Sequence, residues 1–178
     1  MNRSFRFAIS LLLLAPNLAL AQDQPVPIEQ EPRHKLVEEN DLIRIFDTRI
    51  PVSDVSLFHT HRFDSAFVCI EGAETQSEEL GNPIQKRPPF KAGDVWYRPH
   101  STTPLTHRVS NLGKTNFRVL DIELKQALVE SEVAMTKLPK EFVLVLENDR
   151  VRMTRLTLKP GAKTPAHTLT RHALFVIV

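Results

Sequence analysis

Short segments of strand character, with no long amphipathic helix among them, are the feature that most limits the folds open to this chain. Five ranges show period-two alternation or β-branched and aromatic content: 42–49, 55–61, 66–71, 94–98 and 117–124. Turn-forming residues bound them at 51–54, 71–72, 81–83, 88–89, 93–94 and 111–113. Many short strands at regular spacing predict an all-β sandwich or barrel.

The segment 117–124 shows the clearest alternation. Its side chains divide between two faces, with Leu120, Ile122 and Leu124 on one and Val119, Asp121 and Glu123 on the other. Because the apolar face of a half-buried strand usually turns toward the core, we expect the aliphatic face to line the barrel.

Two histidines one residue apart, His59 and His61, lie in the expected strand 55–61. Side chains at i and i+2 of a strand point to the same side, with backbones roughly 6 to 7 Å apart. Two imidazoles placed in this way can hold one metal ion.

These histidines and several later residues resemble the two signature motifs of the cupin superfamily. The chain keeps these motif residues: His59, His61 and Gly72 from the first, and Gly93, Pro99, His107 and Asn111 from the second. It departs at three motif positions and has three extra residues before His107. Ser53 and Ser101 replace glycines, and Ser65 replaces the glutamate ligand. The resemblance implies a cupin double-stranded β-helix, a jelly-roll barrel, from about residue 34 to about residue 123.

The resemblance also implies a metal site with the ligands His59, His61 and His107. Three neutral imidazoles suit a divalent first-row transition metal and leave coordination positions open. The set is similar to that of the thiol dioxygenases and a diketone-cleaving dioxygenase of the cupin superfamily, so iron is favoured, with zinc, manganese, nickel or copper as alternatives. With no carboxylate ligand the metal keeps its dipositive charge, which favours a small anionic substrate.

Three functional classes remain open at this point. The first is a secreted metal-binding cupin acting as an iron-dependent dioxygenase-like enzyme, an oxidoreductase of the three-His type. The alternative is a non-enzymatic small-ligand-binding or scaffold cupin with a degenerate metal site. Zinc-dependent hydrolysis or isomerisation would need a general base beside the metal, and the spacing identifies none. The sequence leaves undecided whether the protein is an enzyme.

Other polar residues near the motifs are expected to lie away from the metal. Asp64 could be a displaced carboxylate ligand, but its parity is opposite to that of Ser65, so a regular strand would point it outward. His100 is expected to be a solvated residue in a loop at the barrel mouth. The remaining histidines, His34, His167 and His172, are expected to be structural or exposed.

Residues 1–21 have the character of a cleaved signal peptide. Arg3 and Arg6 precede an apolar run at 7–14, and Ala19-Leu20-Ala21 matches a cleavage site. A cleaved signal predicts a periplasmic or secreted protein that has no membrane segment after cleavage. The proline-rich, polar stretch 22–33 is expected to be a linker.

Removal of the signal changes the charge balance of the chain. The full sequence has 23 basic and 21 acidic residues. Because the signal holds two arginines and no acidic residue, the mature chain has equal numbers of each, which argues against binding to nucleic acid. A lone cysteine, Cys69, allows no internal disulfide and is expected to be a buried small hydrophobic residue.

The chain contains an internal repeat. A shift of 108 residues aligns 37–70 with 145–178 without a gap and gives nine identities in 34 positions, His59 with His167 among them. The second copy has Gly161 in place of Ser53, but Leu169 and Ala173 at the positions of His61 and the motif glutamate. We therefore expect a cupin domain at 34–126, a connector at 127–140 and a partial second cupin at 141–178, an incomplete two-cupin arrangement (bicupin). Unpaired strand edges in the second copy favour association, so we expect the chain either to self-associate as a homo-oligomer or to present a protease-sensitive tail.

Overall fold

The computed structural model describes residues 24–126 and 138–178. The predicted signal peptide and residues 127–137 of the predicted connector lie outside the described residues. The described elements, apart from one turn of 3-10 helix (η2), are strands. They are β1 (Val26–Pro27), η2 (Ile28–Gln30), β2 (His34–Glu39), β3 (Ile43–Ile50), β4 (His59–His61), β5 (Asp64–Glu71), β6 (Thr75–Glu79), β7 (Gln85–Lys86), β8 (Val95–Arg98), β9 (Leu105–Asn111), β10 (Phe117–Leu124), β11 (Phe142–Glu147) and β12 (Arg152–Leu156).

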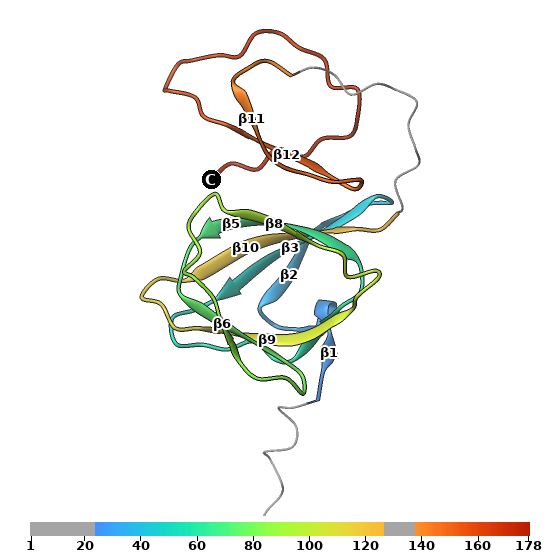
Figure 1. The fold of residues 1–178 in the computed structure, drawn as a ribbon, viewed down its shortest axis with the longest axis vertical. Coiled ribbons are helices and arrows are strands. Elements are labelled where there is room, and N and C mark those ends of the chain that lie inside the picture. Colours follow the sequence, from blue (N-terminus) through green and yellow to red (C-terminus); the bar gives the residue numbers. More distant parts are fainter. Residues whose placement is uncertain (1–23, 127–137) are drawn as a thin grey trace, which may run out of the picture.

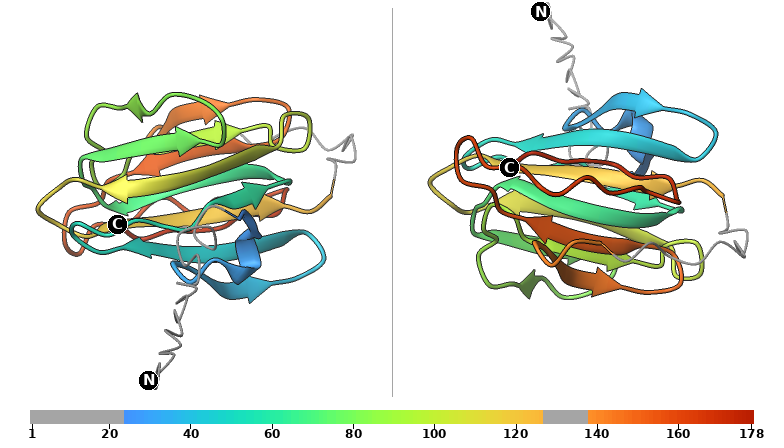
Figure 2. Two further views of the ribbon diagram at one scale, coloured as in Figure 1. Left: turned by 90° about the horizontal axis from the view of Figure 1, so that it is seen from below. Right: turned by 90° about the horizontal axis from the view of Figure 1, so that it is seen from above.

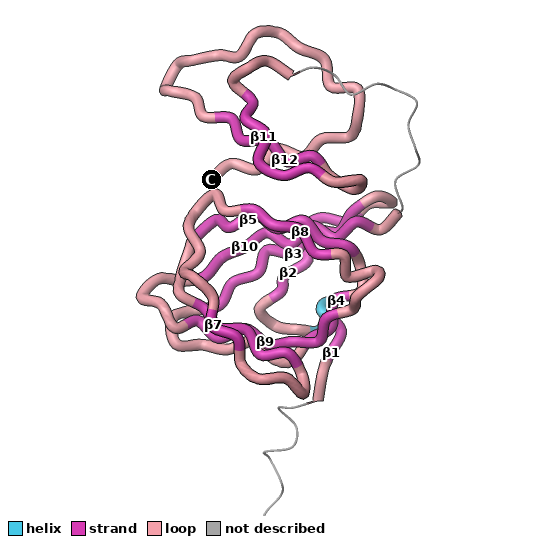
Figure 3. Tube along the Cα trace, in the orientation of Figure 1, coloured by secondary structure: helices cyan, strands magenta, loops and turns pink. Residues whose placement is uncertain are grey.

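Two five-stranded sheets face each other and form a jelly roll (Figure 1). Their strand orders are β1-β4-β9-β6-β7 and β2-β3-β10-β5-β8, and all neighbours are antiparallel except β1 and β4. Figure 3 shows how short loops and turns join most of the strands. The all-β prediction is therefore confirmed. Within the described ranges, no helix combines the length and apolar character that a membrane crossing requires.

The stretch expected to be a linker instead packs on the barrel over its described part, residues 24–33. Val26 pairs with His59 in a parallel register, and Ile28 and Glu31 are each only 2% exposed. Pro27 is compatible with this pairing because β1 is an edge strand, where one side needs no backbone donor. The proline content therefore indicated an edge strand and turns rather than a free linker.

The interior of the barrel is apolar at one end. The buried residues of this inner cluster are Ile50, Phe67, Cys69, Ala73, Phe117 and Val119. Phe67 stacks on Trp96 with ring centroids 4.9 Å apart and an interplanar angle of 7°. Of the neighbours Trp96 and Tyr97, the tryptophan therefore faces inward.

The expected orientation of β10 is wrong. Val119 belongs to the inner cluster, and Asp121 contacts His61 inside the barrel. The opposite face of the same sheet carries a second apolar cluster with the core residues Ile45, Ala66, Val68 and Ile122, against which Leu120 and Leu124 pack. The reason is that this outer face is covered rather than solvated, so its aliphatic side chains are buried there.

The C-terminal segment provides that cover. Val151, Met153 and Val176 pack against the outer cluster, and Figures 1 and 2 show the segment lying across the sheet that contains β10, β5 and β8. Arg150 also donates to the carbonyl oxygen of Gln126 at 2.8 Å and lies 3.3 Å from the Asp64 carboxylate.

The hairpin β11–β12 repeats the hairpin β2–β3 at the 108-residue shift. Both have a bulge at the equivalent place, between Leu36 and Glu38 in the first copy and between Leu144 and Leu146 in the second. The same asparagine turn closes both, with Asn40 accepting from the amide of Ile43 at 3.1 Å and Asn148 from that of Val151 at 2.8 Å. Past Leu156 the described chain has no further strand.

The turn at Ser53, before β4, shows why the motif has glycine at this position. Ser53 has a φ of 61°, a left-handed conformation that favours glycine, and the equivalent Gly161 has a φ of 79°. The amide of Asp54 closes this turn by donating to Pro51 at 3.1 Å. Serine therefore occupies a position whose backbone suits glycine.

Candidate metal centre

The three predicted ligands come together inside the barrel. His59 and His61 project from β4, and His107 projects from β9, where it pairs directly with His59. The Nε2 atom of His61 lies 3.1 Å from the Nε2 of His59 and 3.1 Å from the Nε2 of His107. His59 and His61 are 1% and 3% exposed.

The second nitrogen of each ring lies close to a different polar group. His59 Nδ1 donates to the carbonyl oxygen of Leu57 at 2.9 Å, and His107 Nδ1 lies 3.0 Å from the hydroxyl of Ser77. His61 Nδ1 lies 3.3 Å from a carboxylate oxygen of Asp121, although the angle does not make this contact a hydrogen bond. Because a carbonyl can only accept, we assign the Nδ1–H tautomer to His59.

This tautomer leaves the Nε2 atom of His59 with a free lone pair, 3.1 Å from the Nε2 of His61. Imidazole nitrogens this close repel unless a proton or a cation lies between them. Two nitrogens each about 2.0–2.1 Å from one ion, at roughly a right angle, lie about 3 Å apart. The three nitrogens therefore fit one transition-metal ion, held by rings whose orientation the outer partners fix.

His34 also belongs to this cluster, contrary to the expectation for it. It is buried, and ligand atoms of His34, His59 and His61 all lie within 4.8 Å of one another. Its ring centroid is 4.3 Å from that of His59, and its Nδ1 lies 2.6 Å from a carboxylate oxygen of Glu31. The sequence did not predict a role for His34 in the cluster because this residue lies outside both motifs. Its partner, Glu31, lies in the stretch expected to be a linker.

His100 is buried rather than solvated, so that expectation is also wrong. It is 3% exposed and stacks on His61 with ring centroids 5.0 Å apart. Burial, together with the neighbouring His61, lowers the pKa of His100 to about 4. The turn after Pro99 therefore places a neutral imidazole against a predicted ligand.

Burial also favours the neutral form of two predicted ligands. The pKa of His59 is well below its ordinary value because the ring is desolvated and lies near His34, His107 and His61. Desolvation and the surrounding imidazoles lower the pKa of His107 in the same direction. Neutral imidazole is the form that binds a metal.

An acidic pair lies on β10 beside the cluster. Asp121 is 1% exposed and Glu123 is fully buried. Burial and the Asp121 charge raise the pKa of Glu123 to about 7, although Arg44 donates to it from Nε at 2.7 Å. Ser65 pairs with Glu123 across the two strands, so a carboxylate lies next to the position where the motif glutamate is missing.

Asp64 makes its hydrogen bonds outside the histidine cluster, in agreement with the outward direction expected from its position in the strand. Its carboxylate accepts from the hydroxyl of Tyr97 at 2.8 Å and from the amide of Ser101 at 2.9 Å. It therefore anchors the turn that carries His100. Arg62, which follows the His59–His61 pair, is exposed.

Two further residues have structural roles. Asn111 of the second motif donates to the carbonyl oxygens of Ile50 and Thr115 at 2.9 and 2.8 Å and accepts from Gly113 at 2.9 Å, so it fixes a turn. Cys69 is buried, as expected, and burial raises the pKa of its thiol to about 11.

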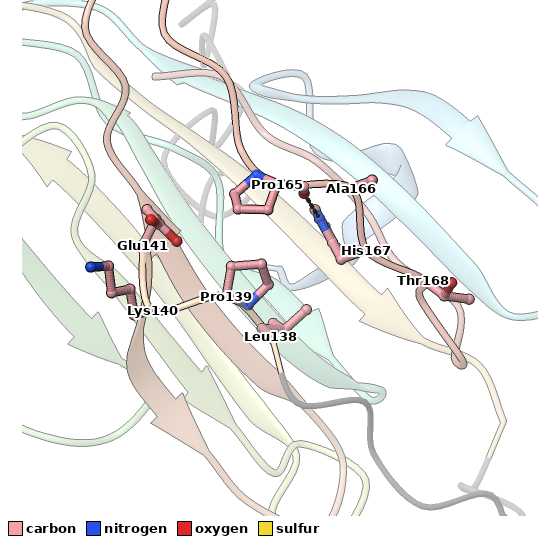
Figure 4. Close-up of a pocket in the computed structure, with 8 residues that line it drawn as sticks. All are labelled: Leu138, Pro139, Lys140, Glu141, Pro165, Ala166, His167 and Thr168. Atoms are coloured by element: carbon pink, nitrogen blue, oxygen red, sulfur yellow. Dashed lines mark hydrogen bonds between the residues drawn. The ribbon is translucent and has the colours of Figure 1, made fainter.

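The second copy has only one equivalent of these histidines. His167 Nδ1 donates to the carbonyl oxygen of Pro165 at 2.9 Å, as His59 does to Leu57. Figure 4 shows His167 lining an open pocket formed by two segments of the second copy, 138–141 and 165–168. Phe142 takes the place of His34 beside it, with ring centroids 5.1 Å apart.

The two paired sheets give the chain the jelly-roll fold that the motifs predicted. The chain is similar to solved structures that are described as cupins. A cupin domain from Bordetella pertussis Tohama I is 21% identical and has a TM-score of 0.45, with 52% of this chain and 92% of that chain covered. An RmlC-like cupin with a double-stranded β-helix from Methanocaldococcus jannaschii is 10% identical and has a TM-score of 0.41, with 54% of this chain and 81% of that chain covered.

A third similar structure is KdgF from Halomonas sp. It is 18% identical and has a TM-score of 0.38, with 55% of this chain and 85% of that chain covered. No family model and no curated protein matched the sequence.

Proposed function

We propose that this chain is an exported metal-binding cupin in which His59, His61 and His107 hold one divalent transition-metal ion, with iron favoured. The convergence of their Nε2 atoms, at 3.1 Å from His61 to each of the other two, is the observation that carries the proposal. The hydrogen bond from His59 Nδ1 to the carbonyl oxygen of Leu57 supports it because this bond fixes the tautomer that leaves the Nε2 lone pair of His59 free. Export to the periplasm or outside the cell rests on the signal-like residues 1–21.

We further propose an oxygenase activity on a small anionic molecule. A bound ferrous ion would supply Lewis acidity and one-electron chemistry with oxygen at its open positions. Imidazole ligands leave the charge of such an ion uncompensated within its own coordination shell, which favours an anionic chelating group. The carboxylate of Asp121 stays outside that shell, beside His61, where it can stabilise positive charge on the ring.

Reconstitution of the purified mature protein, one metal at a time, tests this proposal. We expect one iron per chain and oxygen uptake when small carboxylates, thiols or diketones are supplied. Binding of iron without oxygen uptake for any of these compounds would indicate a non-enzymatic ligand-binding cupin. A protein that binds none of iron, zinc, manganese, nickel or copper would overturn the metal site itself.

A further inference from the structure

We propose that His34 is a fourth nitrogen ligand of the same metal ion, delivered by the N-terminal segment, and that Glu31 is the carboxylate that orients it. The inference rests on the proposed metal site and extends its ligand set. The centre would then be a four-imidazole site, in which a histidine from outside both motifs compensates for the missing glutamate at Ser65.

The position of His34 fits a ligand of this ion. Its Nδ1 is occupied by Glu31 at 2.6 Å, so Nε2 is the nitrogen left for a metal. Ligand atoms of His34, His59 and His61 lie within 4.8 Å of one another. Nitrogens that share one ion at about 2.1 Å lie from about 3 Å apart, when adjacent, to about 4.2 Å, when opposite. The 4.8 Å bound for His34, His59 and His61 exceeds this range only slightly, so His34 lies close enough to these two histidines to share an ion with them after a small movement.

Glu31 is held so that it can perform this orienting role. Besides His34, it accepts hydrogen bonds from the backbone amides of Arg33 at 2.7 Å and Leu57 at 3.0 Å. A buried carboxylate that accepts from an imidazole Nδ1 is the usual outer partner of a metal-bound histidine.

The same carboxylate also connects two ligands. Glu31 accepts from the amide of Leu57, and the carbonyl of Leu57 accepts from His59 Nδ1. The backbone of one residue, Leu57, therefore relates the orientations of His34 and His59. The pairing of Val26 with His59 holds the segment that carries Glu31 against β4.

The second copy has a phenylalanine, which cannot bind a metal, at the place of His34. Phe142 occupies the equivalent of His34 and packs beside His167, with ring centroids 5.1 Å apart and an interplanar angle of 71°, against 4.3 Å and 51° in the first copy. An aromatic ring at this place therefore satisfies packing without any nitrogen. In the first copy the ring has nitrogens and a buried carboxylate partner, which packing alone does not require.

The substitution His34→Phe is the matched test because the chain already uses phenylalanine at the equivalent place. We expect the variant to stay folded, to bind Co²⁺ at least about 10-fold more weakly than wild type, and to show a changed visible spectrum of the bound cobalt. Glu31→Gln should weaken binding by a smaller factor. The control His167→Phe should leave both the affinity and the spectrum unchanged.

The possible results distinguish the two proposals. If wild-type protein binds Co²⁺ and His34→Phe binds it with the same affinity and spectrum, the three-histidine centre stands and the role of His34 is overturned. Absence of Co²⁺ binding by wild type would overturn both. Should His34→Phe fail to fold, X-ray absorption of the cobalt-loaded wild-type protein decides: four imidazole nitrogens support the proposal, and three contradict it.

Discussion

At the scale of single residues, the two nitrogens of each clustered imidazole have different partners. Nε2 faces the centre, whereas Nδ1 contacts Leu57, Asp121 or Ser77. The ligands could be predicted from the sequence because i, i+2 spacing and motif spacing depend on local strand geometry. Their outer partners could not, since Ser77 and Asp121 reach the site from separate strands, through long-range pairing that local patterns do not encode.

Glu123 gives a prediction about pH at this scale. Its pKa of about 7 in the folded protein lies above the ordinary value of 4.5, so the folded state binds the proton more tightly. The contribution of Glu123 to stability should therefore be fully present below about pH 4.5 and should be lost as pH rises toward and past 7. At about 1.4 kcal/mol per pKa unit, the loss is up to roughly 3 kcal/mol.

The variant Glu123→Gln removes this titration. In metal-free protein, its free energy of unfolding relative to wild type should rise between pH 5 and pH 8, by up to about 3 kcal/mol. Urea unfolding followed by the fluorescence of Trp96, the only tryptophan, measures the difference. Parallel stability profiles for the two proteins would mean that Glu123 ionises normally.

At the scale of strands and turns, the all-β fold was predictable because alternation and turn residues are local signals. Which face of β10 points into the barrel was not predictable. Its aliphatic face meets a cover formed by residues more than 25 positions away, such as Val151 and Val176, and alternation alone does not say which of two buried faces is the interior. The segment 24–33 was misread for a related reason, since its strand exists only through pairing with β4.

The turn at Ser53 gives a prediction at this scale. With a φ of 61°, the serine carries a steric cost that glycine avoids, partly offset by the greater flexibility of glycine in the unfolded chain. Ser53→Gly should therefore stabilise the protein by about 0.5–1 kcal/mol. The reciprocal change Gly161→Ser, at a φ of 79°, should act in the opposite direction. Thermal unfolding of both variants is the measurement, and destabilisation by Ser53→Gly would contradict the account.

At the scale of the whole molecule, the second copy acts as a cover on the first barrel. Its described part supplies one hairpin and apolar contacts to the outer cluster. Several of its own apolar side chains remain exposed, with Phe175 at 68% and Ile177 at 94%. The expected self-association is consistent with this exposure and stays a prediction.

Shortening the mature chain to end at Ala127 tests the role of that cover. Because the barrel and the histidine cluster lie within 24–126, the short protein should fold and bind metal with unchanged stoichiometry. It should also unfold at a lower temperature and associate more readily, since the outer cluster loses the cover of Val151, Met153 and Val176. Circular dichroism and sedimentation measure both effects. Failure of the short chain to fold would mean that the second copy is part of the first domain.

The central claim is that the converging imidazoles hold one metal ion, and elemental analysis of purified protein tests it most directly. Wild-type mature protein should contain one divalent transition-metal ion per chain, whereas His61→Ala, which removes the nitrogen lying 3.1 Å from two others, should contain far less. The variant His172→Ala, altered at an exposed histidine, should match wild type. Full metal occupancy in folded His61→Ala protein would contradict the account.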